Sequence, residues 1–372
     1  MGVSKLSRQI TVSVATACLA VGLALPCHGA VRKDDPASIR GAIYIPASDY
    51  NAPQLWKSFS LKVTKRDFGY AREIHLNALR MWASYEYWQA NPAKFQTEFD
   101  EMLDAAHDSG IRILISLFEN DGVPPTPENM WTTDPQKAFD IQSPGRDIAT
   151  GDQSGWEQPR KFVQWFMKRY GNDDRLLAIE VMNEPNRGRN GRPGTVPFAK
   201  SMFETAKSLQ GTVPLTVGSA RVSVAQEFIP LGLDVINFHD NFPASAQVLV
   251  GAIKDALEVG HKTGLPVWLT EWQRVRAGGS GWNGQGLAPQ QRFTDYASLA
   301  STVYSYPVGS FFWSLMVKPA YLPPQRRDGT VNGLFWPDGA VASLKDARAI
   351  SGDPKLQLRE RPIPADFTGV AK

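Results

Sequence analysis

Cysteine is almost absent from this sequence of 372 residues, which contains only Cys18 and Cys27. Both lie within residues 1–29, and this segment has the form of a cleavable leader. The mature chain is therefore expected to contain no cysteine. Disulfides, thiol nucleophiles and cysteine-ligated metals are excluded for it.

The leader, residues 1–29, has the pattern of a secretory signal peptide. Lys5 and Arg8 precede an apolar run that ends at Leu25, and small residues follow it. We expect cleavage near Gly29, a secreted or periplasmic protein, and no membrane attachment of the mature chain. An uncleaved membrane anchor is the alternative.

An excess of charge of one sign is also lacking. The formal net charge is +3 and falls to +1 without Lys5 and Arg8, so nothing indicates nucleic-acid binding. No histidine occurs in a His-x-His or His-Glu-x-x-His arrangement, and neither a serine-hydrolase elbow nor a phosphate-binding loop is present. We therefore expect no cofactor and no catalytic metal.

The chain does contain a series of short apolar segments rich in β-branched and aromatic residues, which predict buried strands. They lie at residues 41–46, 76–82, 111–118, 176–182, 214–218, 235–238, 266–270 and 308–313. Helical patterns lie between most of them, at 95–107, 160–170, 198–209, 247–261 and 290–304.

Strands that alternate with helices indicate a parallel sheet. Eight of them favour a closed (β/α)8 TIM barrel, an α/β fold in one domain over residues 30–372, with the active site at its C-terminal face. An open doubly wound sheet is less favoured because no glycine-rich turn follows the first strand. Two long loops, 119–156 and 278–286, are expected at the same face.

Polar and aromatic residues in or after four of these segments form a recognisable set. They are Arg80, Asn183-Glu184-Pro185, Thr270-Glu271-Trp272 and Trp313. With this set the sequence resembles the retaining glycoside hydrolases of the large clan of (β/α)8 enzymes, and family 5, the cellulase and mannanase family, most of all. The resemblance extends from about Gly41 to about Ile350.

Glu184 and Glu271 are separated by three strand-helix units, so a barrel brings both to its mouth. Two carboxyl groups about 5 to 5.5 Å apart can hydrolyse a glycosidic bond with retention, one as nucleophile and the other as acid and then base. The resemblance assigns the acid/base role to Glu184 and the nucleophile role to Glu271.

The resemblance also implies that Asn183 donates to the sugar 2-hydroxyl and that Trp313 forms the floor beneath the sugar. Arg80 is counted with the substrate-binding residues and is expected beneath Glu271, where its charge would keep the carboxylate ionised. Pairing of Arg80 with Glu180 is a second possibility, and both can be true.

His239 ends the sixth segment, where the family often has a histidine, one further residue and a tyrosine that hydrogen-bonds the nucleophile. Here Asn241 stands in the place of that tyrosine. Three outcomes are open: Asn241 substitutes for it, Asp240 redirects the site, or Tyr304 or Tyr321 comes from elsewhere. His239 itself is expected to bind sugar or to orient the nucleophile.

A second departure follows the third segment, where Glu119-Asn120-Asp121 replaces the histidine-containing stretch that the resemblance implies. Asn120 is predicted to bind sugar, whereas Glu119 and Asp121 are expected to be loop or capping residues. Trp272 is predicted to contact substrate.

We therefore expect a monomeric O-glycoside hydrolase that acts on a β-linked carbohydrate, with β-1,4-glucan and β-mannan as the first candidates. A transglycosylase with the same two glutamates and a barrel that binds glycan without cleaving it are the competing hypotheses.

Overall fold

The computed structural model describes Met1 and residues 30–189, 192–276, 292–320, 326 and 329–364. The predicted signal segment after Met1, the loop 278–286 and Tyr321 lie outside the described residues. Within the described part of the chain, no helix has the length and apolar character needed to cross a bilayer.

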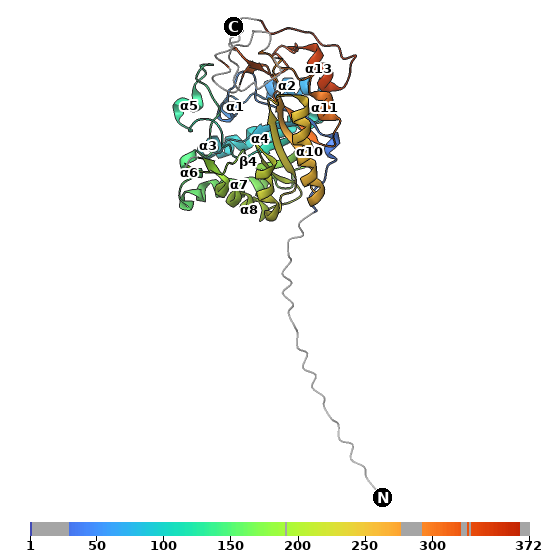
Figure 1. Ribbon diagram of the computed structural model, residues 1–372. Coiled ribbons are helices and arrows are strands. Elements are labelled where there is room, and N and C mark those ends of the chain that lie inside the picture. Colours follow the sequence, from blue (N-terminus) through green and yellow to red (C-terminus); the bar gives the residue numbers. More distant parts are fainter. Residues whose placement is uncertain (2–29, 190–191, 277–291, 321–325, 327–328, 365–372) are drawn as a thin grey trace.

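Eight parallel strands form one sheet in the order β7-β4-β3-β2-β1-β10-β9-β8. They are β1 (Arg40–Ile43), β2 (Ala78–Trp82), β3 (Arg112–Ser116), β4 (Leu176–Asn183), β7 (Leu215–Gly218), β8 (Ile236–Asn241), β9 (Val267–Gln273) and β10 (Gly309–Phe312). Strand β4 lies among the helices in the interior of the fold (Figure 1). All eight predicted strands are present. Two antiparallel pairs lie outside this sheet: β5 (Gly188–Arg189) with β6 (Arg192–Pro193), and β11 (Lys318–Pro319) with β12 (Val331–Asn332).

The two outer strands of this order, β7 and β8, also lie side by side. The backbone amide of Asp234 donates to Leu215 O over 3.1 Å, and that of His239 donates to Ser219 O over 2.9 Å. These bonds close the sheet, so the predicted (β/α)8 barrel is confirmed.

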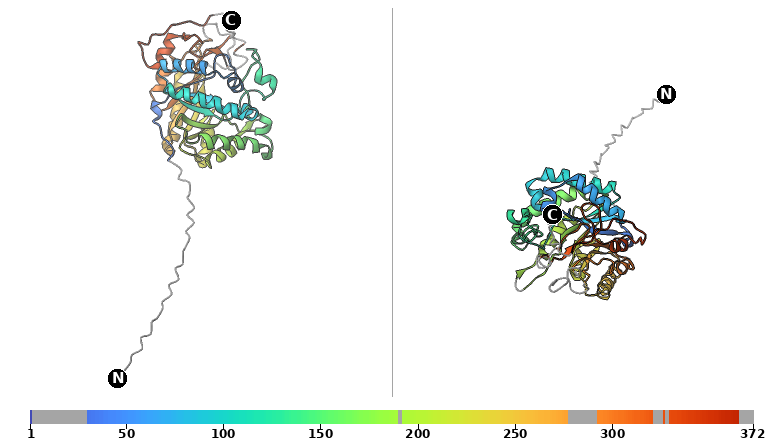
Figure 2. Two further views of the ribbon diagram at one scale, coloured as in Figure 1. Left: turned by 180° about the vertical axis from the view of Figure 1, so that it is seen from behind. Right: turned by 90° about the horizontal axis from the view of Figure 1, so that it is seen from above.

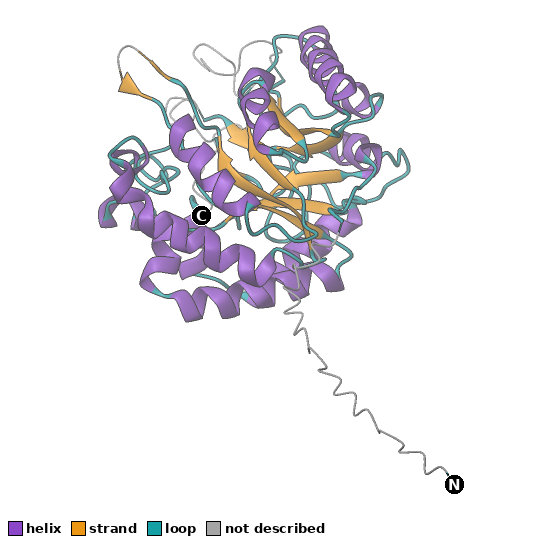
Figure 3. Ribbon diagram, turned by 90° about the horizontal axis from the view of Figure 1, so that it is seen from below, coloured by secondary structure: helices purple, strands orange, loops and turns teal. Residues whose placement is uncertain are grey.

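Helices surround the strands, as the views from above and below show (Figures 2 and 3). They are α1 (Ala52–Lys57), α2 (Leu61–Glu73), α3 (Tyr85–Ala90), α4 (Pro92–Asp108), α5 (Pro127–Trp131), α6 (Arg146–Ala149), α7 (Glu157–Tyr170), α8 (Val196–Lys207), α9 (Val222–Ala225), α10 (Ala246–Thr263), α11 (Ala300–Tyr304) and α13 (Leu344–Ser351), with short 3-10 helices η1 (Pro36–Ser38), η2 (Gln153–Trp156) and η3 (Gln226–Leu231). The predicted helices at 95–107, 160–170, 198–209 and 247–261 correspond to α4, α7, α8 and α10.

Helix α10 illustrates how local sequence sets these elements. The side chain of Ser245 accepts from the amide of Val248 at the first turn, and Gly264 ends the helix with φ of 70°. Leu249, Ile253 and other residues at helical spacing form the buried face that packs on the barrel.

The helix predicted at residues 290–304 is wrong over most of its described length, because only α11 is helical there. The backbone amide of Asp295 donates to Arg274 O over 2.8 Å, and Thr294 forms an antiparallel bridge with Val275. This segment therefore pairs with the chain that leaves β9, and its amides are not available for helical bonds.

The predicted loop 119–156 contains α5, α6 and η2, and its chain returns on itself. Val123 bridges Ile141, and Glu119 bridges both Ser143 and Asn183. The last of these contacts attaches the loop to the end of β4, at the C-terminal face of the barrel.

Candidate active site

Arg80 is the buried cation at the centre of the barrel mouth, and no part of its side chain is exposed. Its Nη1 donates to Glu271 Oε1 over 2.8 Å, and its Nε and Nη2 donate to the two oxygens of Glu180 over 3.0 and 2.5 Å. Nη2 also donates to Asn183 Oδ1 over 2.7 Å. Both predicted pairings of Arg80 are therefore present. Because its side chain is fully buried, Arg80 is not open to a direct contact with substrate, against its place among the substrate-binding residues.

Glu271, in β9, has a donor on each carboxylate oxygen. Oε1 accepts from Arg80, and Oε2 accepts from Nδ2 of Asn241 over 2.7 Å. Nε2 of Gln273 donates to Asn241 Oδ1 over 2.9 Å and so fixes the orientation of that amide. Burial raises the pKa of Glu271, while the charges of His239 and Arg80 and the bond from Asn241 oppose the rise.

Asn241 therefore occupies the place of the expected tyrosine, and neither Tyr304 nor Asp240 fits there. Tyr304 lies in α11 with the guanidinium of Arg40 over its ring at 4.0 Å, and Arg40 begins β1 at the opposite end of the barrel. Asp240 is the strand neighbour of Asn241, so the two side chains point to opposite faces of β8.

Glu184 follows β4 with φ of 43°, a backbone conformation that residues with a Cβ rarely adopt. Its amide donates to Gly218 O over 2.8 Å. A Cβ at residue 218 would lie only 2.7 Å from Glu180 Oε1, so glycine leaves room there for the carboxylate of Glu180. Strained backbone of this kind is typical of functional sites. Burial raises the pKa of Glu184.

His239 lies between the two glutamates. Its Nδ1 is 2.6 Å from Glu184 Oε1 and 3.6 Å from Glu271 Oε1. The hydrogen bond of His239 is therefore with Glu184 and not with Glu271, the expected nucleophile. Burial lowers the pKa of His239 and outweighs the opposing effect of the neighbouring carboxylates. A contact of His239 with sugar stays a prediction.

Oxygen atoms of Glu184 and Glu271 and a ring nitrogen of His239 lie within 4.8 Å of one another. The two carboxyl groups are thus about as close as retaining glycosidases require. These three residues could hold a metal ion, but the guanidinium of Arg80 already supplies positive charge to Glu271. We assign carboxyl chemistry to this group.

Asn183, at the end of β4, is oriented from both ends of its amide. Arg80 donates to its Oδ1, and its Nδ2 lies 2.9 Å from both carboxylate oxygens of Glu119. Glu119 is buried, and it lies in the loop beyond β3, where it accepts from the amide of Asp121 as a capping residue does, so the expectation of a loop or capping residue holds; it also orients Asn183. The contact of Asn183 with a sugar hydroxyl stays a prediction.

Asn120 is buried, and protein groups occupy both ends of its amide. Its Oδ1 accepts from Thr195 Oγ1 over 2.9 Å and from Asn186 Nδ2 over 3.2 Å, and its Nδ2 donates to Asp121 over 3.2 Å. These bonds give Asn120 a structural role, since they tie the loop 119–156 to the segment that follows β4. A contact of Asn120 with sugar stays a prediction.

Trp272 is fully buried and packs edge-on against Tyr296 at a centroid distance of 5.9 Å. Because successive side chains in a strand alternate, the inward position of Glu271 turns Trp272 outward, toward the helices. The prediction that Trp272 contacts substrate is wrong.

Trp313 directly follows β10 and is only partly buried. Its ring packs against that of Trp82, at the end of β2, with centroids 6.0 Å apart. Trp313 therefore lies at the C-terminal face of the barrel, and its role as the sugar floor stays a prediction.

Asp121, which was expected to be a loop or capping residue, forms a side-chain hydrogen bond with Glu184. Asp121 lies beyond the end of β3 in a loop that pairs with the end of β4, and no local pattern in the sequence indicates that pairing.

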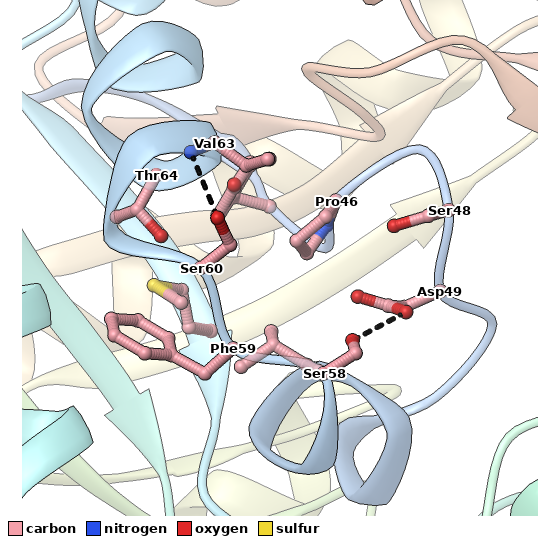
Figure 4. A pocket seen from close by; sticks show the side chains of 11 residues that line it. Pro46, Ser48, Asp49, Ser58, Phe59, Ser60, Val63 and Thr64 are labelled. Atoms are coloured by element: carbon pink, nitrogen blue, oxygen red, sulfur yellow. Dashed lines mark hydrogen bonds between the residues drawn. The ribbon is translucent and has the colours of Figure 1, made fainter.

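A separate pocket lies between the loop after β1 and the start of α2 (Figure 4). Asp49 accepts from Ser58 Oγ over 2.8 Å at its edge. The volume of this pocket, about 30 Å³, leaves room for about two water molecules and is too small for a sugar ring.

The chain matches a known family over most of its length. The family model described as Cellulase (glycosyl hydrolase family 5) matches residues 51–318. No curated protein matches the chain.

Solved structures with a similar fold include a GH5_18 protein from Streptomyces cattleya in complex with GlcNAc, with a TM-score of 0.55, 12% identity, and coverage of 87% of this chain and 82% of that chain. The endo-β-1,4-mannanase from Thermotoga petrophila has a TM-score of 0.55, 14% identity, and coverage of 86% and 77%. An exo-β-1,4-mannosidase from Opitutaceae bacterium strain TAV5 has a TM-score of 0.58, 15% identity, and coverage of 84% and 58%. At these identities the likeness shows the fold alone.

Proposed function

The chain belongs to glycosyl hydrolase family 5, the cellulase family, and on this basis we propose that it hydrolyses a β-linked glycan with retention of configuration. Glu271 is the nucleophile, and Glu184 is the acid and then the base. The observation that carries this proposal is the presence of two adjacent carboxyl groups in different environments. Glu271 bonds to Arg80 and Asn241, which favour its ionised form.

Glu184 is placed differently. Among the described residues it forms no salt bridge with a lysine or arginine, and its partners are His239 and Asp121. Burial raises its pKa, which favours the protonated form that an acid needs. Burial raises the pKa of both groups, but only Glu271 bonds to a guanidinium, and this difference supports the two roles.

In the first step the carboxylate of Glu271 attacks the anomeric carbon, and Glu184 gives its proton to the glycosidic oxygen as that bond breaks. In the second step Glu184 takes a proton from water, whose oxygen attacks the same carbon and displaces Glu271. Arg80 and Asn241 would stabilise Glu271 when it is released as a carboxylate.

We propose a β-1,4-mannoside as the first substrate candidate and β-1,4-glucan as the second. The support is the set of structures with a similar fold, which includes an endo-β-1,4-mannanase and an exo-β-1,4-mannosidase. Export through the leader 1–29 is also proposed, on the strength of its sequence pattern. N-terminal sequencing of the exported protein tests the cleavage near Gly29.

The test uses purified β-mannans, β-glucans and aryl glycosides with the wild type, Glu184→Gln and Glu271→Gln. Both variants should lose about 10⁴-fold or more in kcat, as for removal of a group in an acid/base and nucleophile pair. Exposed Glu101→Gln is the control and should retain activity. Proton NMR should show the β-anomer as the first product; the α-anomer, or near wild-type activity in either variant, would refute the assignment.

Rescue by azide separates the two roles. In Glu271→Ala, azide can attack only from the face that Glu271 vacates, which gives an α-glycosyl azide. In Glu184→Ala, azide attacks the glycosyl-enzyme from the opposite face, which gives a β-glycosyl azide. The reverse pair of products would exchange the two roles.

A further inference from the structure

The carboxyl groups of Asp121 and Glu184 are joined by a side-chain hydrogen bond. Two carboxyl groups can form such a bond only when one of them carries a proton, because an ionised carboxylate has no donor. The pair therefore contains a proton next to the group that transfers protons in the function proposed above, and the inference rests on that function.

The fold fixes Asp121 in this place. Residues 119–121 continue beyond β3 and pair with the end of β4, where Asn120 N donates to Asn183 O over 3.2 Å. The amide of Asp121 donates to Glu119 Oε1 over 2.7 Å, and Nδ2 of Asn120 donates to Asp121 Oδ1 over 3.2 Å. Both the backbone and one carboxyl oxygen of Asp121 are thus held by neighbours.

The charged surroundings of Asp121 come from several elements. Burial and the charge of Glu184 raise the pKa of Asp121 to about 8, and His239 and Arg146 oppose the rise. Burial raises the pKa of Glu119 and of Asp140, and the charge of Asp121 adds to both rises. The groups that face it are Glu119, Asp140, Arg146, Glu184 and His239. Buried carboxyl groups packed in this way cannot all ionise together at neutral pH.

We propose that Asp121 and Glu184 share one proton, and that Asp121 is the positioning residue that keeps this proton available for the leaving group. When the glycosidic bond breaks, the proton moves to the glycosidic oxygen and leaves two adjacent carboxylates. Their repulsion makes Glu184 a stronger base toward water in the second step. The proton taken from water restores the shared proton.

The test is the pH profile of kcat/KM for Asp121→Asn. The amide preserves the shape but can donate to ionised Glu184, so the pKa of Glu184 falls and the acid is lost at lower pH. The alkaline limb of the profile should move to lower pH by about one unit or more. At pH values above the limb, kcat/KM should therefore fall roughly tenfold. A glycoside with an acidic phenol as leaving group needs little proton donation and should be cleaved at near wild-type rate.

The control is Glu128→Gln, which removes an exposed carboxyl from the same loop and should keep the wild-type profile. An alkaline limb at the wild-type pH in Asp121→Asn would overturn the proposal. So would an equal loss at every pH with both kinds of substrate, since that is the result of a merely structural role.

A second measurement needs neither activity nor folding of Asp121→Asn. NMR of protein with isotope-labelled aspartate carboxyls should show one that titrates near pH 8, and its pKa should fall in Glu184→Gln, where the partner charge is absent. Titration of every aspartate unchanged by Glu184→Gln would overturn the shared proton. If the wild type cleaved no glycan, the proposed function would fail while this measurement still tested the pair.

Discussion

Asn241 donates its amide hydrogen to Glu271 over 2.7 Å, from a strand position two residues beyond His239. The resemblance implied a tyrosine in this position. An asparagine amide reaches the carboxylate here because Gln273 donates to the other end of the same amide and fixes its rotation. The second partner of Glu271 is therefore an amide, which donates but does not ionise.

The first prediction concerns this bond. Asn241→Ala should lower kcat/KM by about 10- to 100-fold, because a hydrogen bond to a charged group contributes about 1.5 to 3 kcal/mol. The bond favours ionised Glu271, so its loss raises the pKa of Glu271 and moves the acid limb of the pH profile to higher pH. Asn241→Asp should move it further, because it adds a like charge.

The measurement is kcat/KM across the acid range for both variants. Asn91→Ala is the control, since Asn91 is exposed and its side chain makes no capping hydrogen bond. An acid limb that stays at the wild-type pH in both Asn241 variants would contradict the role assigned to this amide.

The second prediction concerns the buried cation. Arg80→Met would leave the carboxylates of Glu180 and Glu271 without their common cation, so the free energy of unfolding should fall by about 3 to 5 kcal/mol. Arg80→Lys should recover only part of this loss, because one ammonium cannot make all the bonds of the guanidinium fork.

Urea unfolding and kcat measured on the same samples provide the check. Arg72→Met, at an exposed position on α2, should change neither. A fully stable Arg80→Met protein would show that the network does not depend on this cation.

The barrel could be predicted from sequence because each buried strand is a local apolar run, and eight such runs separated by helices determine the fold class. The helix predicted at 290–304 failed for a non-local reason. Its apolar spacing is helical, but the amide of Asp295 bonds to Arg274 O, and no pattern within the segment indicates that partner.

The residues of the site also divide into those that a local pattern locates and those that depend on a distant partner. Arg80, Glu184, His239 and Glu271 could be placed because strand ends meet at one face of a barrel. Glu119 and Asp121 could not, because their positions depend on how the loop 119–156 pairs with β4.

The wrong prediction that Trp272 contacts substrate could have been avoided from the sequence. Alternation along β9 excludes a ring from the barrel interior when its neighbour Glu271 occupies it.

The third prediction is a dependence of stability on pH that arises from Glu86, in the first turn of α3. Ser143 Oγ donates to Glu86 Oε2 over 2.7 Å, and burial raises the pKa of Glu86 to about 7. Because the folded pKa is higher than the unfolded value, the folded state binds more protons between the two. The contribution of Glu86 to the free energy of unfolding is therefore fully present below the unfolded pKa and is lost as pH rises through about 7.

Glu86→Gln removes this titration. The fall in unfolding free energy from about pH 5 to about pH 8 should become smaller by about 1 to 3 kcal/mol. Urea unfolding at both pH values measures it, with exposed Glu101→Gln as the control that leaves the slope unchanged. Equal slopes in Glu86→Gln and the wild type would contradict the raised pKa.

The last prediction concerns Trp313, whose ring lies at the barrel mouth against Trp82. A sugar ring that stacks on this indole buries apolar CH groups on a flat face, so Trp313→Ala should raise KM by roughly 10- to 30-fold, or about 1.4 to 2 kcal/mol. Trp313→Phe keeps a smaller flat face and should lie between the alanine variant and the wild type. The matched control is Trp165→Phe, on α7 outside the barrel, which should leave KM unchanged. Because stacking acts on binding of the sugar at the cleavage point, a loss of kcat alone, with KM unchanged in both Trp313 variants, would show that this ring does not form the floor of the site.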